Sequence, residues 1–184
     1  RLLRLHGEAP SSVTEEEVKA MIAEGTDAGV FHEAERDLLE GVIRFADRPL
    51  RSVMVPRHAM IWIDANAPLD TAIAEMLESG HSRFPLCNGS IDDVVGYVHV
   101  KDSLEMQRVG GSALRSIVRA PLYVSESIPA LRMIELFRSS GIHIAMVVDE
   151  YGGFMGVVTL EDILREIVGD IGDEFEVVEK EIER

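Results

Sequence analysis

The chain has 184 residues, enough for one compact domain or two small ones, and 46% of them are hydrophobic but only 5% aromatic. Its formal net charge of −15 argues against a nucleic-acid partner and against adsorption to anionic lipid. Cys87 is the only cysteine, which excludes an internal disulfide and favours a reduced, cytoplasmic setting with the thiol packed in the core.

The first 50 residues are acidic and predict two helices. Thr14 and the three glutamates after it fit a capping box that starts a helix, and Gly25 is expected to stop it. A second helix is predicted from about Glu33. Its apolar side consists of Leu38, Leu39, Val42, Ile43 and Phe45. The glutamate run indicates a solvated face and no metal site, because consecutive helical residues point in different directions.

From about residue 51 the sequence repeats itself. In the first copy, strands are predicted at 61–63, 84–86 and 94–98, with a helix after the first strand and a second helix entered at 99–102. In the second copy the strands are predicted at 122–124, 144–148 and 154–158. The register is fixed by three matched pairs: Pro68 with Pro129, Gly80 with Gly141, and Gly96 with Gly156.

Each copy is therefore strand, helix, strand, strand, helix, with proline at the helix start and glycine at its end. A unit this small buries too little apolar surface to be stable alone, so the two copies should pack sheet to sheet in an α+β fold. The predicted division is an acidic helical segment at 1–50, which the resemblance described below would make a juxtamembrane linker, copies at 51–108 and 117–170, a flexible linker at 109–116 and an acidic tail at 171–184.

The stretch from Gly156 to Asp162 predicts a strand that runs directly into a helix, with Thr159 at the junction. The free N–H groups and partial positive charge of a helix N-terminus favour an anion, and a threonine hydroxyl can join them on a phosphate. Asp162, one turn on, could accept hydrogen bonds from a ribose diol. Thr-x-x-Asp is also close to an ordinary capping box, and both interpretations stay open.

Several motifs lie in one register with this stretch. They are 53–57 (VMVPR), 81–86 (HSRFPL), 143–153 (HIAMVVDEYGG), 156–162 (GVVTLED) and 169–175 (GDIGDEF). In this combination the chain resembles a pair of CBS domains, the adenine-nucleotide-binding module of many enzymes, channels and transporters. The narrower resemblance is to the CorC/HlyC group and the related cyclin M transporters, implicated in magnesium and cobalt efflux.

The resemblance implies a nucleotide site in a cleft between the copies, with AMP or ATP as ligand and Mg²⁺ accompanying ATP to neutralise its phosphates. Thr159 would contact phosphate, Asp162 the ribose, His143 and Arg83 the phosphates. The implied site residues are Val55, His81, Ser82, Arg83, Phe84, Pro85, His143, Thr159 and Asp162.

Alternatives remain for single residues. Arg83 lies in an apolar strand and could pair with phosphate, with an acidic residue, or be exposed, and His143 could be a core histidine. Position 55 is Val where the group often has Thr. The second cleft is expected to be degenerate, since His99 stands where the second copy has Thr159, although Asp102 is retained.

The resemblance implies a regulatory module of a divalent-cation (magnesium/cobalt) efflux protein, with a homodimer through the CBS pair and a membrane transport domain as partners. The expected setting is the cytosolic part of an inner-membrane protein, with further domains before residue 1 and after the acidic tail. The alternative is a structural homodimerisation module with a vestigial cleft. An enzyme is not expected, because no nucleophile with a neighbouring base and no Walker-type loop are present.

Overall fold

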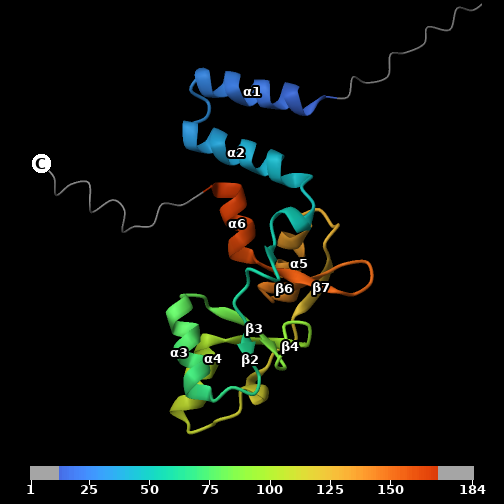
Figure 1. The fold of residues 1–184 in the computed structure, drawn as a ribbon. Helices are drawn as coiled ribbons and strands as arrows, with labels where there is room; N and C mark the ends of the chain where they lie inside the picture. The colour runs from blue at the N-terminus through green and yellow to red at the C-terminus, as the bar shows by residue number, and fades with distance from the viewer. Residues whose placement is uncertain (1–12, 170–184) are drawn as a thin grey trace, which may run out of the picture.

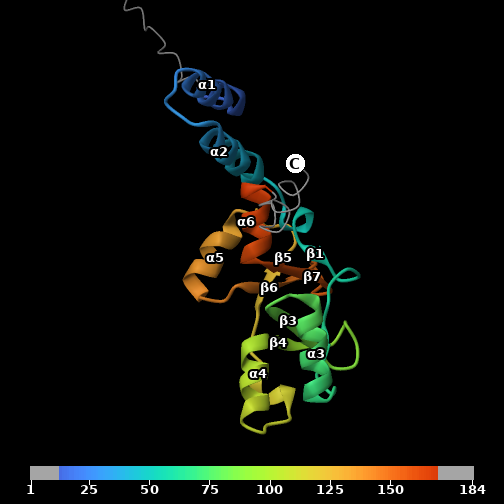
Figure 2. The same ribbon diagram turned by 90° about the vertical axis from the view of Figure 1, so that its left-hand side faces the viewer.

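The structure is a computed structural model that describes residues 13–169. Two helices that run in opposite directions, α1 (Glu15–Asp27) and α2 (Glu33–Ala46), precede two similar units, each made of helices and a sheet (Figure 1). The units are stacked, and α1 and α2 lie at the end of the second unit that faces away from the first in both views (Figure 2). The predicted α+β class and the leading helices are confirmed.

The first unit follows the short 3₁₀ turn η1 (Leu50–Ser52). Its elements are β2 (Ile63–Asp64), α3 (Leu69–Ser79), β3 (Arg83–Cys87), β4 (Val94–His99) and α4 (Val100–Arg108). They form a three-stranded sheet in the order β2-β3-β4, with β2 parallel and β4 antiparallel to β3. Apolar side chains from α3 and this sheet fill the first core, and Leu114 in the turn η2 (Leu114–Ile117) joins them. The predicted linker therefore contributes to the core.

The second unit repeats this order. Its elements are β5 (Leu122–Ser125), α5 (Arg132–Ser140), β6 (Ile144–Val148), β7 (Phe154–Thr159) and α6 (Leu160–Val168). Its sheet has a fourth strand, β1 (Val55–Pro56), and the order is β1-β7-β6-β5. β1 falls within the predicted first copy, yet it pairs with β7 of the second unit. The second sheet is therefore completed by a strand that the repeat assigns to the first copy.

The exchange of strands is reciprocal, and two glycines permit it. Val55 of β1 lies opposite Val157, and Arg119, just before the second unit, forms a bridge with Tyr97 of β4. A Cβ on Gly156 would lie 2.1 Å from the carbonyl oxygen of Val55, and one on Gly96 would lie 2.6 Å from that of Arg119. The glycines paired in the repeat are therefore the positions where the exchanged strand approaches most closely.

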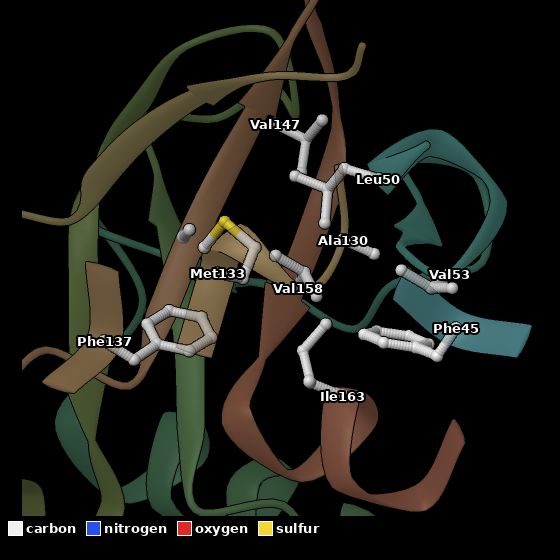
Figure 3. Packing of buried hydrophobic residues seen from close by; sticks show 10 residues of the cluster. Phe45, Leu50, Val53, Ala130, Met133, Phe137, Val147, Val158 and Ile163 are labelled. Carbon is white, nitrogen blue, oxygen red and sulfur yellow. The ribbon is translucent and has the colours of Figure 1, made fainter. Parts of the chain in front are cut away.

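The segment that leaves α2 packs against the second unit. Phe45, Leu50 and Val53 are buried beside Val158 and Ile163 of β7 and α6 (Figure 3). Backbone bonds hold this segment to the β5–α5 connection, where Leu50 N–H donates to the carbonyl of residue 128 at 2.9 Å. The boundary at residue 51 stays a prediction, but the side chains on both sides of it belong to the second core.

A third apolar cluster joins the two sheets, as the predicted sheet-to-sheet packing requires. It is formed by β4, β6, β7 and the chain between β1 and β2. Its buried members are Met60, Tyr97, Ile144, Met146 and Val157. Burial of side chains from both units in one cluster opposes their separation.

Three expected boundaries were wrong. Helix α1 continues past Gly25 to Asp27, and β2 starts only at Ile63, where pairing with β3 begins. Helix α5 starts at Arg132 and not directly after Pro129. Pro129 forms a β-bridge with Pro49, so the turn at Pro129 pairs with the segment that follows α2. The predictions for the opening residues, for the GDIGDEF motif beyond Gly169 and for the tail concern residues outside the described range.

Candidate functional site

A cavity of about 820 Å³ lies between the two units. Both units line it, together with the chain after β1. Of the residues implied by the resemblance, the lining includes Val55, His81, Ser82, Arg83, Pro85, His143, Thr159 and Asp162. The structure thus brings together side chains more than a hundred residues apart in the sequence, Val55 and Asp162 being 107 positions apart.

One wall is the N-terminus of α6, where Thr159 and Asp162 form a capping box. Asp162 N–H donates to the Thr159 hydroxyl at 3.2 Å, and Thr159 N–H and hydroxyl both donate to Oδ2 of Asp162, at 2.8 and 2.7 Å. In the part of the chain that the structure describes, no hydrogen bond reaches Oδ1 of Asp162. The capping interpretation is confirmed, and it leaves one carboxylate oxygen to accept from another donor.

The facing wall comes from the first unit. His81 and Ser82 are exposed, and Arg83 is half-buried at the start of β3. Among residues 13–169 the Arg83 guanidinium makes no hydrogen bond or ion pair, so the acidic partner considered for it is not found there. A half-buried guanidinium with five free donors at a cavity is suited to a phosphate or carboxylate.

Phe84 and His143 differ in where the structure places them. Phe84 is fully buried in the first core and does not line the cavity, and its place in the site stays a prediction. Because successive side chains of a strand point to opposite faces, Arg83 and Pro85 face the cavity and Phe84 faces the core. His143 is half-buried at the cavity, and its carbonyl accepts from Leu160 N–H at 3.2 Å.

Several lining residues were missed from the sequence. Ala59, Met60 and Ile61 come from the long connection between β1 and β2, which has no periodic pattern. Arg165 lies one turn beyond Asp162 on α6, and its guanidinium pairs with Glu161 at 2.9 Å on the surface. Helical spacing from Asp162 was the signal that could have found Arg165.

The site concentrates basic groups in a strongly acidic protein. Arg83, Arg165, His81 and His143 surround the cavity together with the N-terminus of α6, whose first N–H groups carry partial positive charge. The apolar side chains of Val55 and Met60 provide the rest of the wall. A cavity with an apolar part, a cationic part and a free carboxylate oxygen can hold an anionic ligand that also carries an apolar group.

A second cavity, of about 590 Å³, lies by α4 and includes His99 and Asp102. Nδ1 of His99 accepts from Lys101 N–H at 3.1 Å and caps α4. Burial lowers the pKa of His99, the positive charge of Arg83 lowers it further, and the Asp102 carboxylate opposes this. Asp102 itself pairs with Arg119 at 2.5 Å.

Two features are absent from residues 13–169. No helix described there is long and apolar enough to cross a bilayer. No group of three or more His, Cys, Asp or Glu side chains in the same range is arranged to hold a metal ion.

Two repeated units with a cavity walled by both define a paired ligand-binding domain. The sequence profile of the CBS domain matches residues 50–102 and 114–169, and the chain belongs to the CBS domain family. Its relatives place it with the CorC type of that family. It is 39% identical over 173 residues to the magnesium and cobalt efflux protein CorC of Salmonella typhimurium, covering 93% of this chain and 58% of CorC.

Hemolysin C of Brachyspira hyodysenteriae is 40% identical over 150 residues, covering 82% of this chain and 56% of that protein. The chain thus spans somewhat more than half the length of these two relatives. Among solved structures, the CBS domain of a bacterial CNNM/CorC family Mg²⁺ transporter is 34% identical with a TM-score of 0.77, covering 88% of this chain and all of that one.

Two similar structures contain a nucleotide. A CBS domain of a bacterial CNNM/CorC family Mg²⁺ transporter in complex with ATP is 35% identical with a TM-score of 0.68, covering 74% of this chain and 99% of that one. A CBS-domain pair with bound AMP from Klebsiella pneumoniae is 30% identical with a TM-score of 0.58, covering 66% and 98%.

Proposed function

We propose that this CBS pair binds an adenine nucleotide in the cavity between its units and thereby regulates a divalent-cation transporter of the CorC type. The observation that carries the proposal is the pairing of the Thr159/Asp162 helix terminus with Arg83 across one cavity. The ATP and AMP complexes of similar CBS domains support the ligand class.

Each part of the cavity suits one part of a nucleotide. The Thr159 hydroxyl and the first N–H groups of α6 would bind phosphate, as helix N-termini do. The free oxygen of Asp162 would accept from a ribose hydroxyl. Val55, Met60 and Pro85 would contact the adenine, and Arg83 and His143 would bind the phosphates.

The phosphate number sets how much counter-charge the site needs. AMP could be held by Arg83 and the helix terminus alone, whereas ATP brings more negative charge into a protein whose net charge is −15. Mg²⁺ is readily bound by ATP phosphates, and we propose that ATP enters with it. Binding of ATP that strengthens with added Mg²⁺ supports this, and binding that does not change contradicts it.

Regulation requires that the ligand prefer one arrangement of the units over another. The cavity is walled by both units, so a bound nucleotide would oppose any change in their relative position. Helix α6 begins at the site and ends against α2, where a Cβ on Gly41 would lie 2.2 Å from the Ile167 carbonyl oxygen. This direct backbone contact would carry the change to α2, and through α1 to a transport domain.

The partners follow from the same proposal. We propose a homodimer through the CBS pair, a membrane transport domain elsewhere in the full-length protein, and a location on the cytosolic side of the inner membrane. Light scattering of the isolated chain, with and without nucleotide, tests the dimer, and a monomer under both conditions contradicts it.

Calorimetry with AMP and Mg-ATP tests the site. Asp162→Ala removes the ribose acceptor, and loss of a hydrogen bond to a charged group, worth about 1.5–3 kcal/mol, weakens binding at least tenfold. Glu17→Ala is the matched control, because it removes the equivalent carboxylate from the capping box of α1, where Thr14 N–H donates to Glu17 at 2.9 Å. Equal affinity of both variants and the wild-type protein would remove Asp162 from the site.

The competing function is a structural dimerisation module whose cavity binds no nucleotide. Val55, which offers no hydroxyl to the base, is the feature in its favour. A folded wild-type dimer that releases no heat and shows no thermal shift with AMP, ADP or Mg-ATP would support this alternative.

A further inference from the structure

The second cavity corresponds to only half of the first. Its residues from β4 and α4 match those that β7 and α6 contribute to the first cavity, with His99 for Thr159 and Asp102 for Asp162. Among residues 13–169, no residue that follows Arg108 in the chain lines this second cavity. What is missing is the wall that Val55 and its neighbours supply in the first cavity.

The strand pairings identify the residue that stands in this missing wall. Gly96 and Gly156 are equivalent in the repeat, so Tyr97 is equivalent to Val157. Val55 pairs with Val157 and Arg119 pairs with Tyr97, so Arg119 is the equivalent of Val55. A long cationic side chain therefore stands at the position where a small apolar one lines the first cavity.

The chain after Arg119 is also shorter. The parallel pairings make Ile63 equivalent to Val124, since they face the equivalent residues Leu86 and Val147. Val55 and Ile63 are eight positions apart, whereas Arg119 and Val124 are five apart. The three missing positions fall in the connection that brings Ala59, Met60 and Ile61 to the first cavity.

We propose that Arg119 blocks the second cleft by pairing with Asp102, the carboxylate that a ribose would need there, so that the chain binds one nucleotide. The Arg119 guanidinium lies 2.5 Å from Oδ2 of Asp102; the Asp102 side chain is 26% exposed and the Arg119 side chain 53% exposed. A ribose hydroxyl would have to displace an ion pair in which both groups are charged, whereas its own bond to the carboxylate would have only one charged partner. This inference rests on the proposed nucleotide site and names the residue that limits it to one.

The experiment is calorimetric stoichiometry with Mg-ATP and AMP on the folded chain. Arg119→Val with His99→Thr gives the second cleft the residues of the first. We expect one bound nucleotide per chain for the wild-type protein and for His99→Thr alone. The double variant should bind a second nucleotide, with an affinity at least tenfold lower than that of the first site, because the wall formed by residues 59–61 has no counterpart in the second cleft. Arg132→Ala, which breaks an exposed ion pair with Glu135, is the control and should keep one event.

The outcomes separate the two proposals. Two binding events in the wild-type protein would overturn the role proposed for Arg119. So would a single binding event in a double variant that still unfolds cooperatively, and either result leaves the proposal for the first site unchanged. No event in the wild-type protein but one in the double variant overturns the function proposed for the Thr159/Asp162 site and supports the role proposed for Arg119. Asp102→Asn gives a further check, because a blocked second cleft predicts that it leaves wild-type affinity within twofold.

Discussion

Replacement of Gly156 by alanine tests the exchanged strand on which the cavity depends. The added Cβ would lie 2.1 Å from the carbonyl oxygen of Val55 and 3.0 Å from Cα of Pro56. Both are backbone atoms, so no side-chain rotation can relieve the contact. Reaching an ordinary separation of 3.4 Å requires β1 to move by about 1.3 Å (3.4 minus 2.1), which would also break its hydrogen bonds to β7.

The cost has two parts. Overpacking of this kind costs about 1–3 kcal/mol, and loss of a backbone hydrogen bond adds about 1 kcal/mol, so the free energy of unfolding should fall by about 2–4 kcal/mol. For a chain of this size the melting temperature should fall by roughly 4–16 °C. Because Val55 lines the cavity, displacement of β1 should also weaken nucleotide binding.

Gly96→Ala provides a matched comparison. Its Cβ would lie 2.6 Å from the carbonyl oxygen of Arg119, at the second cleft. Differential scanning calorimetry should show destabilisation of both variants, and isothermal titration should show loss of affinity only for Gly156→Ala. A Gly156→Ala protein that melts within 1 °C of wild type would refute the close approach of β1, and equal loss of affinity in both variants would refute its link to the cavity.

Three further predictions concern single side chains. Arg83→Gln should weaken binding of Mg-ATP and AMP at least tenfold but that of adenosine little, because the guanidinium is expected to contact phosphate; equal losses measured by calorimetry for all three would contradict this. Burial lowers the pKa of His99 below its ordinary value of 6.5, so the neutral form is favoured in the folded chain, and stability present above that pH should be lost as the pH falls. The free energy of unfolding, measured with urea, should fall less between pH 7.5 and pH 5.5 in His99→Asn than in the wild-type protein. An equal fall in both proteins would contradict the lowered pKa of His99. Burial, reinforced by Asp93 and Asp64, raises the pKa of the Cys87 thiol to about 11, which leaves roughly a hundredfold less thiolate at pH 8 than a pKa of 9 would. Native Cys87 should therefore react with a thiol reagent at least a hundredfold more slowly than the unfolded chain, and comparable rates would show that the thiol is accessible.

Local signals in the sequence were sufficient for the repeated unit. Gly80 and Gly141 end their helices in the left-handed region, at φ of 72° and 70°, as expected for glycine at these positions. The exchange of β1 and Arg119 between the units left no such signal. Val55 and Val157 are 102 positions apart, Tyr97 and Arg119 are 22 apart, and neither pairing produces a periodicity along the chain. The matched glycines fixed the register of the repeat but did not indicate what would approach them.

The candidate site could be predicted where its chemistry is local. Thr159 and Asp162 were predicted because a strand running into a helix is visible in the sequence; the structure places both at the cavity and confirms that they cap α6. Phe84 belongs to the same motif as Arg83 but faces the first core, because a strand alternates its faces. Arg119 was missed because its equivalence with Val55 depends on strand register across a connection of different length.

Nuclear magnetic resonance of the ¹⁵N-labelled chain, titrated with AMP and with Mg-ATP, tests the central claim most directly, because it reports both binding and its place. The proposed function predicts the largest amide shifts at residues 159–162 and 81–83, on both sides of the cavity, with little change at residues 99–102. Shifts confined to residues 99–102, or no shifts at ligand concentrations that saturate a micromolar site, would contradict it.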